Sequence, residues 1–229
     1  MARGAKRAAQ ISQMALVRLI PLGDRGLTIE LPEADPERVF GLAGALQRLI
    51  DDGALPGASE LLPAMRSVSL FFDPLTAEPD SWSEKLLALA AAEPRQAGSG
   101  RQVEIPVCFD QDYGPELAAM AGDREAFISQ FLAAGVTVRF LGFMPGFAYL
   151  GDVPEPLRAP RLTTPRSSVP AGSVGIAGQF CAVYPWNSPG GWNLIGRTPL
   201  SLFDPGNSER PALLAPGDRV VWRRIARWT

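Results

Sequence analysis

The chain has 229 residues, of which 46% are hydrophobic and 20% are charged, and its formal net charge is −2. This composition is typical of a soluble globular protein with a sizeable core, and it shows no basic excess that would favour nucleic acid as a partner. The chain has no histidine, which excludes Ser-His-Asp and Cys-His nucleophile systems and any histidine-ligated metal within it. Its two lysines, Lys6 and Lys85, fall in an expected tail and an expected surface helix, so we expect no Schiff-base chemistry.

Cysteine spacing and hydropathy bear on the compartment. Cys108 and Cys181 are far apart and match neither a metal nor a redox spacing, so we expect two buried or half-buried thiols in a reducing cytosol. No stretch reaches the ~18 uncharged apolar residues of a membrane span. Arg18, Asp24 and Arg25 interrupt the apolar run that a signal peptide would need. We therefore expect a cytoplasmic protein with no membrane partner and no metal.

The first part of the chain predicts a tail at residues 1–14 and a small α+β domain at residues 15–93. The expected elements, in chain order, are strands at Ala15–Ile20 and Leu27–Leu31, a helix that starts after Asp35 and stops near Gly53, strands at Glu60–Pro63 and Ser67–Phe72, and a helix at Ser81–Ala92. Asp35 followed by Pro36 and Glu37 is typical of a helix start, because it combines an N-cap, a proline at the first position and an early acid. This order favours helices on one face of an antiparallel sheet.

Residues 94–101 combine Pro, Gly, Ser and charge without apolar periodicity, so we expect a linker there and a second domain at residues 102–229. The expected elements that follow are a strand at Val103–Phe109, helices at Gly114–Ala121 and Asp123–Ala133, and a strand at Val136–Phe143. Between Met144 and Gly217 the chain is rich in Pro and Gly, and short apolar pieces alternate with turn signals. This pattern predicts a small β-barrel or sandwich with ordered loops.

Two segments of this second domain carry candidate binding residues. Phe140–Gly151 contains a Met-Pro-Gly bend between aromatic residues, so it forms either a pocket wall or barrel core and a turn. Ala159–Ser173 holds Arg161 and Arg166 on a backbone stiffened by prolines, beside serine and threonine hydroxyls. Such guanidinium groups suit a carboxylate or phosphate, and the alternative is an ordered loop whose arginines pair locally.

A third segment, Tyr184–Thr198, combines aromatic residues with the pair Gly190-Gly191 and with Arg197. The glycines let the backbone approach a ligand or partner closely, while tryptophan and arginine are common at protein interfaces. The alternative is a glycine turn that closes a barrel corner. No pair of carboxylates has a spacing that places both on one helical face, so we assign no catalytic residue. Gly172–Gly178 has three glycines, but it lacks the strand-to-helix context of a nucleotide site.

These segments read FLGFMPGFAYLG from Phe140, APRLTTPRSSVPAGSVGIAG from Ala159 and YPWNSPGGWNLIGRTPLSLFDP from Tyr184. Their order and spacing resemble the bacterial family of the 5-oxoprolinase B subunit, also called allophanate hydrolase subunit 1 or KipI, and the likeness runs from about Ala15 to Trp228. The resemblance implies an α+β N-terminal domain followed by a mostly-β, cyclophilin-like barrel C-terminal domain. It also implies a hetero-complex with a protein similar to the C subunit of 5-oxoprolinase, with the A subunit as a further partner.

The function implied by the resemblance is that of one subunit in an ATP-dependent amide hydrolase of the 5-oxoprolinase type. Such a protein is expected to be inactive alone, with its site completed by a partner that is also a candidate to bind the ATP. One alternative is a KipI-like non-catalytic protein that binds and inhibits a histidine kinase, and another is a divergent carboxyltransferase component. Neighbouring genes for a protein like the C subunit or for a kinase would discriminate between the first two.

The substrate-binding residues that we expect are Phe143, Pro145, Arg161, Arg166, Ser173, Tyr184, Trp192 and Arg197. The three arginines would hold a carboxylate or phosphate, and the serine and tyrosine would hydrogen-bond the substrate. The remaining apolar residues would shape the pocket or the partner interface.

The chain also departs from the family pattern at several positions. Relatives often carry a histidine near Phe131, a Gln-Thr-Gly run where this chain has Phe180, Cys181 and Ala182, and a glutamine at Asn193. Polar groups that would line a site are thus replaced by apolar or smaller ones.

Overall fold

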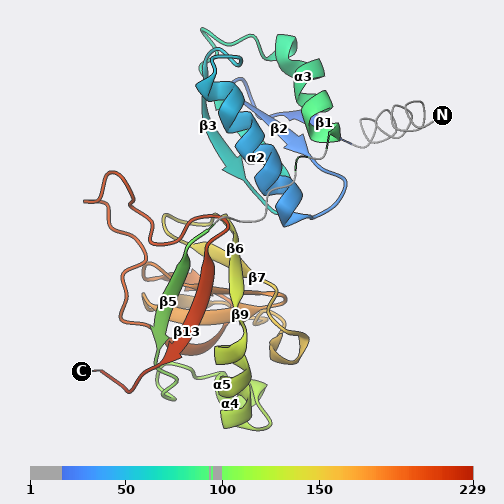
Figure 1. Cartoon of the computed structure of the whole chain (residues 1–229). Coiled ribbons are helices and arrows are strands. Elements are labelled where there is room, and N and C mark those ends of the chain that lie inside the picture. The colour runs from blue at the N-terminus through green and yellow to red at the C-terminus, as the bar shows by residue number, and fades with distance from the viewer. Residues whose placement is uncertain (1–16, 93, 95–99, 229) are drawn as a thin grey trace, which may run out of the picture. The chain divides into compact units, whose positions relative to one another are not determined.

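The computed structural model describes residues 17–92, 94 and 100–228, and the chain divides into two compact units, Met1–Ser99 and Gly100–Thr229 (Figure 1). The expected tail at residues 1–14 and residues 95–99 of the expected linker lie outside the described residues.

The first unit is a four-stranded antiparallel sheet with two helices. Its elements are β1 (Arg18–Pro21), β2 (Gly26–Glu30), α2 (Pro36–Asp51), β3 (Ala58–Pro63), β4 (Ser67–Phe72) and α3 (Pro79–Ala91), in the strand order β1-β2-β4-β3. Along β4, Val68, Leu70 and Phe72 are buried and alternate with half-buried serines and phenylalanine, so one face of the sheet carries the core. Helices α2 and α3 contribute to that same core.

The starting residues of α2 act as the sequence predicts. The Asp35 side chain accepts a hydrogen bond from the Arg38 backbone N–H at 3.2 Å, and Pro36 occupies the first turn. On α3, Trp82 packs edge-on against Phe72 with ring centroids 5.6 Å apart, which ties the helix to β4.

The second unit is a barrel of seven strands with few helices. Its elements are β5 (Gln102–Val107), α4 (Leu117–Met120), α5 (Arg124–Ala133), β6 (Val136–Leu141), β7 (Ala148–Gly151), the 3-10 helix η1 (Glu155–Leu157), β8 (Arg166–Val169), β9 (Ser173–Ala177), β10 (Phe180–Val183), β11 (Ser188–Gly190), β12 (Asn193–Arg197) and β13 (Arg219–Arg224). The large sheet has the order β12-β9-β10-β7-β6-β13-β5, and β8 pairs with β11 in a separate two-stranded sheet. The expected mostly-β barrel is confirmed at this level, while its likeness to cyclophilin stays a prediction.

The barrel is nearly closed by one isolated pair of residues. Cys108, which follows β5, and Arg197, which ends β12, exchange two backbone N–H···O hydrogen bonds of 2.9 Å each. The edges of the seven-stranded sheet thereby meet, which removes most of the unpaired strand edge. The approach is close, since a Cβ on Gly196 would lie 2.7 Å from the Cys108 carbonyl oxygen.

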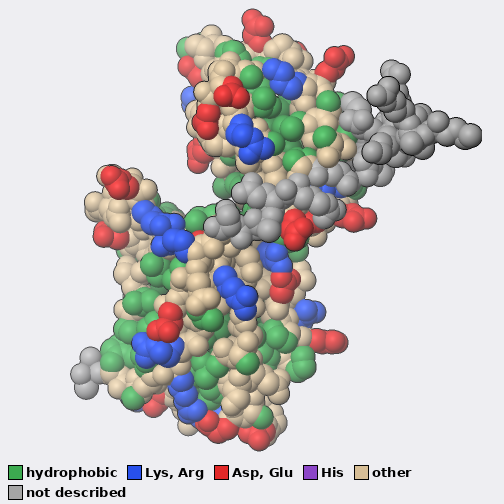
Figure 2. Space-filling model, in the orientation of Figure 1, with side chains coloured by type: hydrophobic (Ala, Val, Ile, Leu, Met, Phe, Trp, Pro, Cys, Tyr) green, Lys and Arg blue, Asp and Glu red, His purple; other side chains and the backbone are tan. Residues whose placement is uncertain are grey.

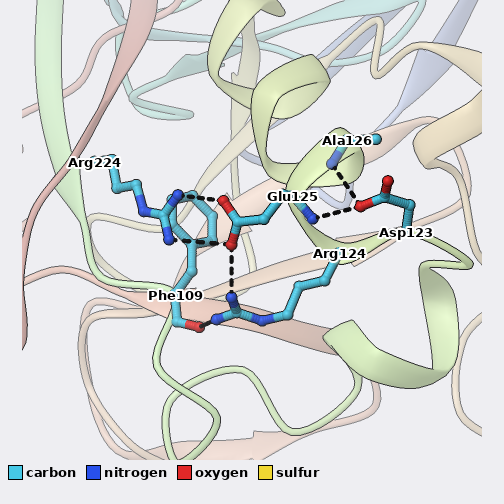
Figure 3. Close-up of polar contacts among 6 residues, drawn as sticks. All are labelled: Phe109, Asp123, Arg124, Glu125, Ala126 and Arg224. Carbon is cyan, nitrogen blue, oxygen red and sulfur yellow. Dashed lines mark hydrogen bonds and ion pairs between the residues drawn. The ribbon is translucent and has the colours of Figure 1, made fainter.

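Helix α5 is fixed to the barrel through its first turn (Figure 3). Asp123 caps the helix by accepting from the backbone N–H groups of Glu125 and Ala126 at 3.0 and 3.1 Å. Glu125 pairs with two guanidinium groups, those of Arg124 and of Arg224 in β13, and hydrogen bonding to Arg224 lowers the pKa of the Glu125 carboxyl. Arg124 also donates to the Phe109 carbonyl oxygen, so the cluster joins the helix, β13 and the segment after β5.

For this unit, the expected end of one strand needs correction, and the expected state of the two cysteines is confirmed. The strand expected at Val136–Phe143 ends at Leu141, because Phe143 has a φ of 70°, which is incompatible with an extended strand. Cys108 and Cys181 are both free and buried, as expected, and burial raises the pKa of the Cys181 thiol.

The close packing of the segment after β5 against β12 predicts that position 114 tolerates no side chain larger than that of glycine. A Cβ there would overlap the Ile195 carbonyl group of β12, and this neighbour is backbone that cannot rotate away. We expect Gly114→Ala to lower the free energy of unfolding by about 1–3 kcal/mol in urea titrations of the full chain. The matched control is Gly122→Ala, which has open space around its Cβ and is expected to change stability by less than about 0.5 kcal/mol. Equal stability of the two variants would contradict the closure argument.

Candidate functional site

A pocket with a volume of about 810 Å³ opens in the second unit, and we call it the first pocket. Its walls are mostly aromatic, since they include Phe143, Phe147, Tyr149, Phe180, Tyr184 and Trp192. Prolines and glycines complete the lining, and Arg161 is the charged residue among the described residues that line it. The size and the apolar walls with a few polar groups are typical of a small-molecule site.

Phe147 organises the aromatic wall. Its side chain is 1% exposed and packs edge-on against Phe143, Tyr149, Tyr184 and Trp192 at centroid distances of 5.3, 5.1, 5.4 and 5.6 Å. Edge-to-face packing of this kind adds about 0.5–1.5 kcal/mol per pair beyond the burial of area. The wall is therefore held in place before any ligand arrives.

Gly190 on β11 allows the Tyr184 ring to lie in this wall. A Cβ at position 190 would overlap the Tyr184 hydroxyl oxygen and lie 2.9 Å from two ring carbons. The glycine pair noted in the sequence therefore makes room for an aromatic ring of the pocket.

The polar groups of the first pocket are two phenols and one guanidinium. Burial raises the pKa of the Tyr149 phenol above its ordinary value of 10.0, and the positive charge of Arg161 opposes that rise. Burial likewise raises the pKa of Tyr184, against a hydrogen bond with the Trp192 backbone and the charges of Arg161 and Arg166. Both phenols are thus neutral donors at physiological pH. Arg161 is exposed and has no carboxylate partner among the residues that the structure describes.

This arrangement can recognise a small ligand that has a flat apolar body and oxygen acceptors. The guanidinium suits a carboxylate, and a phenol O–H can donate to a carbonyl oxygen. Among the described residues that line the first pocket there is no serine, cysteine or carboxylate side chain. Because burial raises the pKa of both phenols, the groups in this lining suit binding better than nucleophilic attack or general-base catalysis at neutral pH.

The other expected polar residues lie elsewhere. Arg166, Ser173 and Arg197 line a separate cavity of about 290 Å³, which we call the second pocket. Arg166 forms an ion pair with Glu116, whose other carboxylate oxygen accepts from the Leu194 backbone N–H at 2.8 Å. The structure therefore does not bring the three expected arginines together, since Arg161 belongs to the first pocket, and their roles stay predictions.

Pro145 does not line either pocket among the described contacts. Its carbonyl oxygen accepts a hydrogen bond from the Trp186 indole N–H at 3.1 Å, which joins the turn after β6 to the loop before β11. Trp186 is 43% exposed, and Phe143, two residues before Pro145, is 62% exposed, which is high for such large apolar side chains.

The sequence reasoning missed Phe147, Tyr149 and Phe180 as pocket residues. Phe147 and Tyr149 are two positions apart at β7, and alternate residues of a strand point to one face. This two-residue spacing, within the aromatic segment Phe140–Gly151, is the sequence signal that could have identified both residues as neighbours on one wall of the pocket. Glu116 was also missed, because its partner Arg166 is 50 residues away in the chain and no local pattern links them.

The departures from the family pattern fall mostly outside the first pocket. Phe131 is 1% exposed in the barrel core, where it contacts Trp222 at a centroid distance of 4.9 Å. Cys181 and Ala182 are buried in β10, and the Asn193 amide donates to the carbonyl oxygens of Pro160 and Ile176. Only Phe180 of these positions contributes to the pocket lining.

Other kinds of site receive no support within the described residues. No group of three or more potential metal ligands occurs among them, and none of their helices is both long and apolar enough to span a bilayer. On the face of the second unit drawn in Figure 2, basic and acidic side chains are interspersed rather than gathered into one basic patch.

The second unit thus combines a nearly closed barrel with a mostly aromatic pocket, whose described lining offers one guanidinium and two phenols. The chain belongs to the carboxyltransferase domain family, subdomains C and D, which matches residues 17–214.

Named relatives sharpen this assignment and confirm the resemblance seen in the motifs. The chain is 38% identical to the B subunit of 5-oxoprolinase from Bacillus subtilis (strain 168) over 223 residues, which cover 90% of this chain and 91% of that protein. It is 39% identical to the B subunit of 5-oxoprolinase from Escherichia coli O157:H7 over 223 residues, covering 90% and 95% of the two chains. The crystal structure of TTHA0988 matches with a TM-score of 0.74 and 35% identity, covering 90% of this chain but 40% of that one.

The phenols of the first pocket predict a specific pH dependence. The folded-state pKa values of Tyr149 and Tyr184 are raised above the unfolded-state value of 10.0, so the folded chain holds the two phenol protons more tightly than the unfolded chain does. Their contribution to the free energy of unfolding is therefore fully present below pH 10.0 and is lost as the pH rises through the folded-state pKa values. We expect the free energy of unfolding to fall with pH above 10.0, and the double variant Tyr149→Phe/Tyr184→Phe to fall less steeply. Urea unfolding at a series of alkaline pH values measures both slopes. Identical slopes would show that these phenols are not the groups responsible.

Proposed function

We propose that this chain is the substrate-binding component of an ATP-dependent amide hydrolase of the 5-oxoprolinase type, with its site completed by a partner subunit. The observation that carries the proposal is the first pocket, whose described lining offers Arg161 and two neutral phenols on aromatic walls but no serine, cysteine or carboxylate side chain. Two relatives of similar length carry the name of the 5-oxoprolinase B subunit, which supports a cyclic amide with a carboxylate as substrate.

In this proposal each polar group has one task. Arg161 holds the substrate carboxylate, and the Tyr184 or Tyr149 hydroxyl donates to the amide carbonyl oxygen, where negative charge develops when the C–N bond is opened. The aromatic wall contacts the ring and excludes water. A pocket of about 810 Å³ is much larger than 5-oxoproline, which leaves room for side chains of the partner that supply the general base.

We assign ATP to a partner protein of the complex. Gly172–Gly178, the glycine-containing stretch of this chain, forms β9 and the turn after it rather than a loop that opens a helix. It therefore lacks the N-terminal amide cradle that phosphate groups bind, so the residues present do not fit a nucleotide there.

The first test is Arg161→Gln in the complex purified from the source cells. We expect the KM for 5-oxoproline to rise by about tenfold or more, because a charge-assisted hydrogen bond to the carboxylate is lost. The matched control is Arg223→Gln, which removes an exposed arginine that pairs with Glu104 on the barrel surface. Unchanged KM in Arg161→Gln would remove this residue from the substrate site.

The exposed aromatic pair supports a partner surface beside the first pocket. Phe143 has a strained backbone conformation and is 62% exposed, and Trp186 is held by its hydrogen bond to Pro145. Strain and exposure of apolar rings are costs that an interface would offset. The same surface fits the second candidate function, a KipI-like protein that binds and inhibits a histidine kinase without catalysis.

The two candidates share a prediction about this surface. We expect Phe143→Ser/Trp186→Ser to weaken association with the co-purified partner by about tenfold or more, measured by sedimentation of the complex. The control is Leu75→Ser, which replaces a residue of the first unit that is 91% exposed. A partner similar to the C subunit of 5-oxoprolinase supports the hydrolase, a kinase supports the inhibitor, and unaltered association would place the interface elsewhere.

A further inference from the structure

The second pocket has a built polar lining that the proposed function does not use. Along β8, alternate residues Arg166 and Ser168 line it, while Val169 points to the opposite face and packs in the cluster that holds the aromatic wall. In the pairing of β9 with β12, Ser173 lies directly opposite Arg197, so both side chains face the same side of the sheet. Strand β8 thus separates this cavity from the first pocket.

The charges around the second pocket leave one guanidinium uncompensated. Arg166 pairs with Glu116, and Asp112 pairs with Arg227, whose guanidinium also lies 3.5 Å from Asp110. Arg197 has no carboxylate partner among the described residues, although it is half-buried. A partly buried charge without a counter-ion is costly, so a bound anion would be stabilised here.

Arg197 is also held in position. Its Nε donates to the Ala171 carbonyl oxygen at 2.8 Å, and its guanidinium carbon lies 5.7 Å from the centroid of the Tyr113 ring. The two terminal nitrogens make no hydrogen bond within the described residues. A guanidinium fixed at Nε with free terminal N–H groups presents the planar fork that binds two oxygens of one anion.

Ser173 adds a hydroxyl beside this fork. The residue is 2% exposed, lines the cavity, and its hydroxyl has no hydrogen-bond partner among the residues that the structure describes. As a residue that lines the cavity, Ser173 can donate this hydroxyl to a ligand that enters it.

We propose that the second pocket is a binding site for a small oxyanion. Two oxygens of the anion pair with the terminal N–H groups of Arg197, and the hydroxyl of Ser173, with the more exposed Ser168, donates to the remainder. The cavity of about 290 Å³ limits the ligand to a single carboxylate or phosphoryl group with few attached atoms. The site is independent of the proposed hydrolase function, because none of its anion-binding residues lines the first pocket.

The test is a titration of the full chain with inorganic phosphate at constant ionic strength, followed by phosphorus NMR, with acetate as a competing carboxylate. We expect Arg197→Gln to weaken phosphate binding by about tenfold or more, and Ser173→Ala to weaken it by a smaller factor. The matched control is Arg223→Gln, which removes an exposed arginine that pairs with Glu104 on the barrel surface and is expected to leave binding within about twofold. Arg161→Gln reports any anion that binds in the first pocket instead.

The relative affinities of the two anions identify the chemical class of the ligand. Stronger binding of phosphate than of acetate indicates a phosphoryl group, and the reverse indicates a carboxylate. If Arg197→Gln unfolds, Arg197→Lys retains the charge without the fork and is expected to bind more weakly than the parent chain. Equal binding by all variants, loss of binding in Arg161→Gln alone, or no binding of either anion would overturn the proposal.

Discussion

The pair of backbone hydrogen bonds between Cys108 and Arg197 is the constraint on which the second unit depends. It fixes the end of β12 against the segment after β5 and requires small residues where the two backbones approach, as at Gly196. Because Trp192 precedes β12 and Arg197 ends it, the strand that closes the barrel also connects the two pockets. The contacts that close the barrel therefore also set the positions of residues in both pockets.

The first pocket gains its shape from a core that is separate from the barrel interior. Phe147, Tyr184 and Trp192 belong to a cluster with Val169 of β8, outside the main barrel core. A rigid aromatic surface with neutral phenols and one guanidinium is suited to select a ligand by shape and by a single charge. It is less suited to chemistry that needs a titrating group near neutral pH, and the chain has no histidine to supply one.

Local signals predicted much of the fold. The caps at Asp35 and Asp123 have the hydrogen bonds that their sequence positions indicate, and the Pro- and Gly-rich second half forms short strands. The short strands β7, β8 and β11 were not predicted, because three or four residues give too little periodicity. The end of β6 was misplaced because a positive φ at a phenylalanine leaves no trace in the sequence.

The site was predictable in composition but not in grouping. Phe143, Arg161, Tyr184 and Trp192 do line one pocket, as expected of residues within these motifs. The structure places Arg161 in a different pocket from Arg166 and Arg197. The reason is long-range, since the ion pair of Arg166 with Glu116 and the pairing of β9 with β12 decide where those two side chains lie. Contacts that join residues far apart in the chain have no local signature.

The position of β13 has a consequence for biosynthesis. This strand lies between β5, with which it is parallel, and β6, with which it is antiparallel, although both partners precede it by many residues in the chain (Figure 1). During translation β5 and β6 therefore leave the ribosome with vacant edges that wait for a strand not yet made. Such edges are templates for intermolecular pairing, and contacts of large sequence separation form slowly. The seven-stranded sheet therefore cannot be completed until residue 224 has left the ribosome.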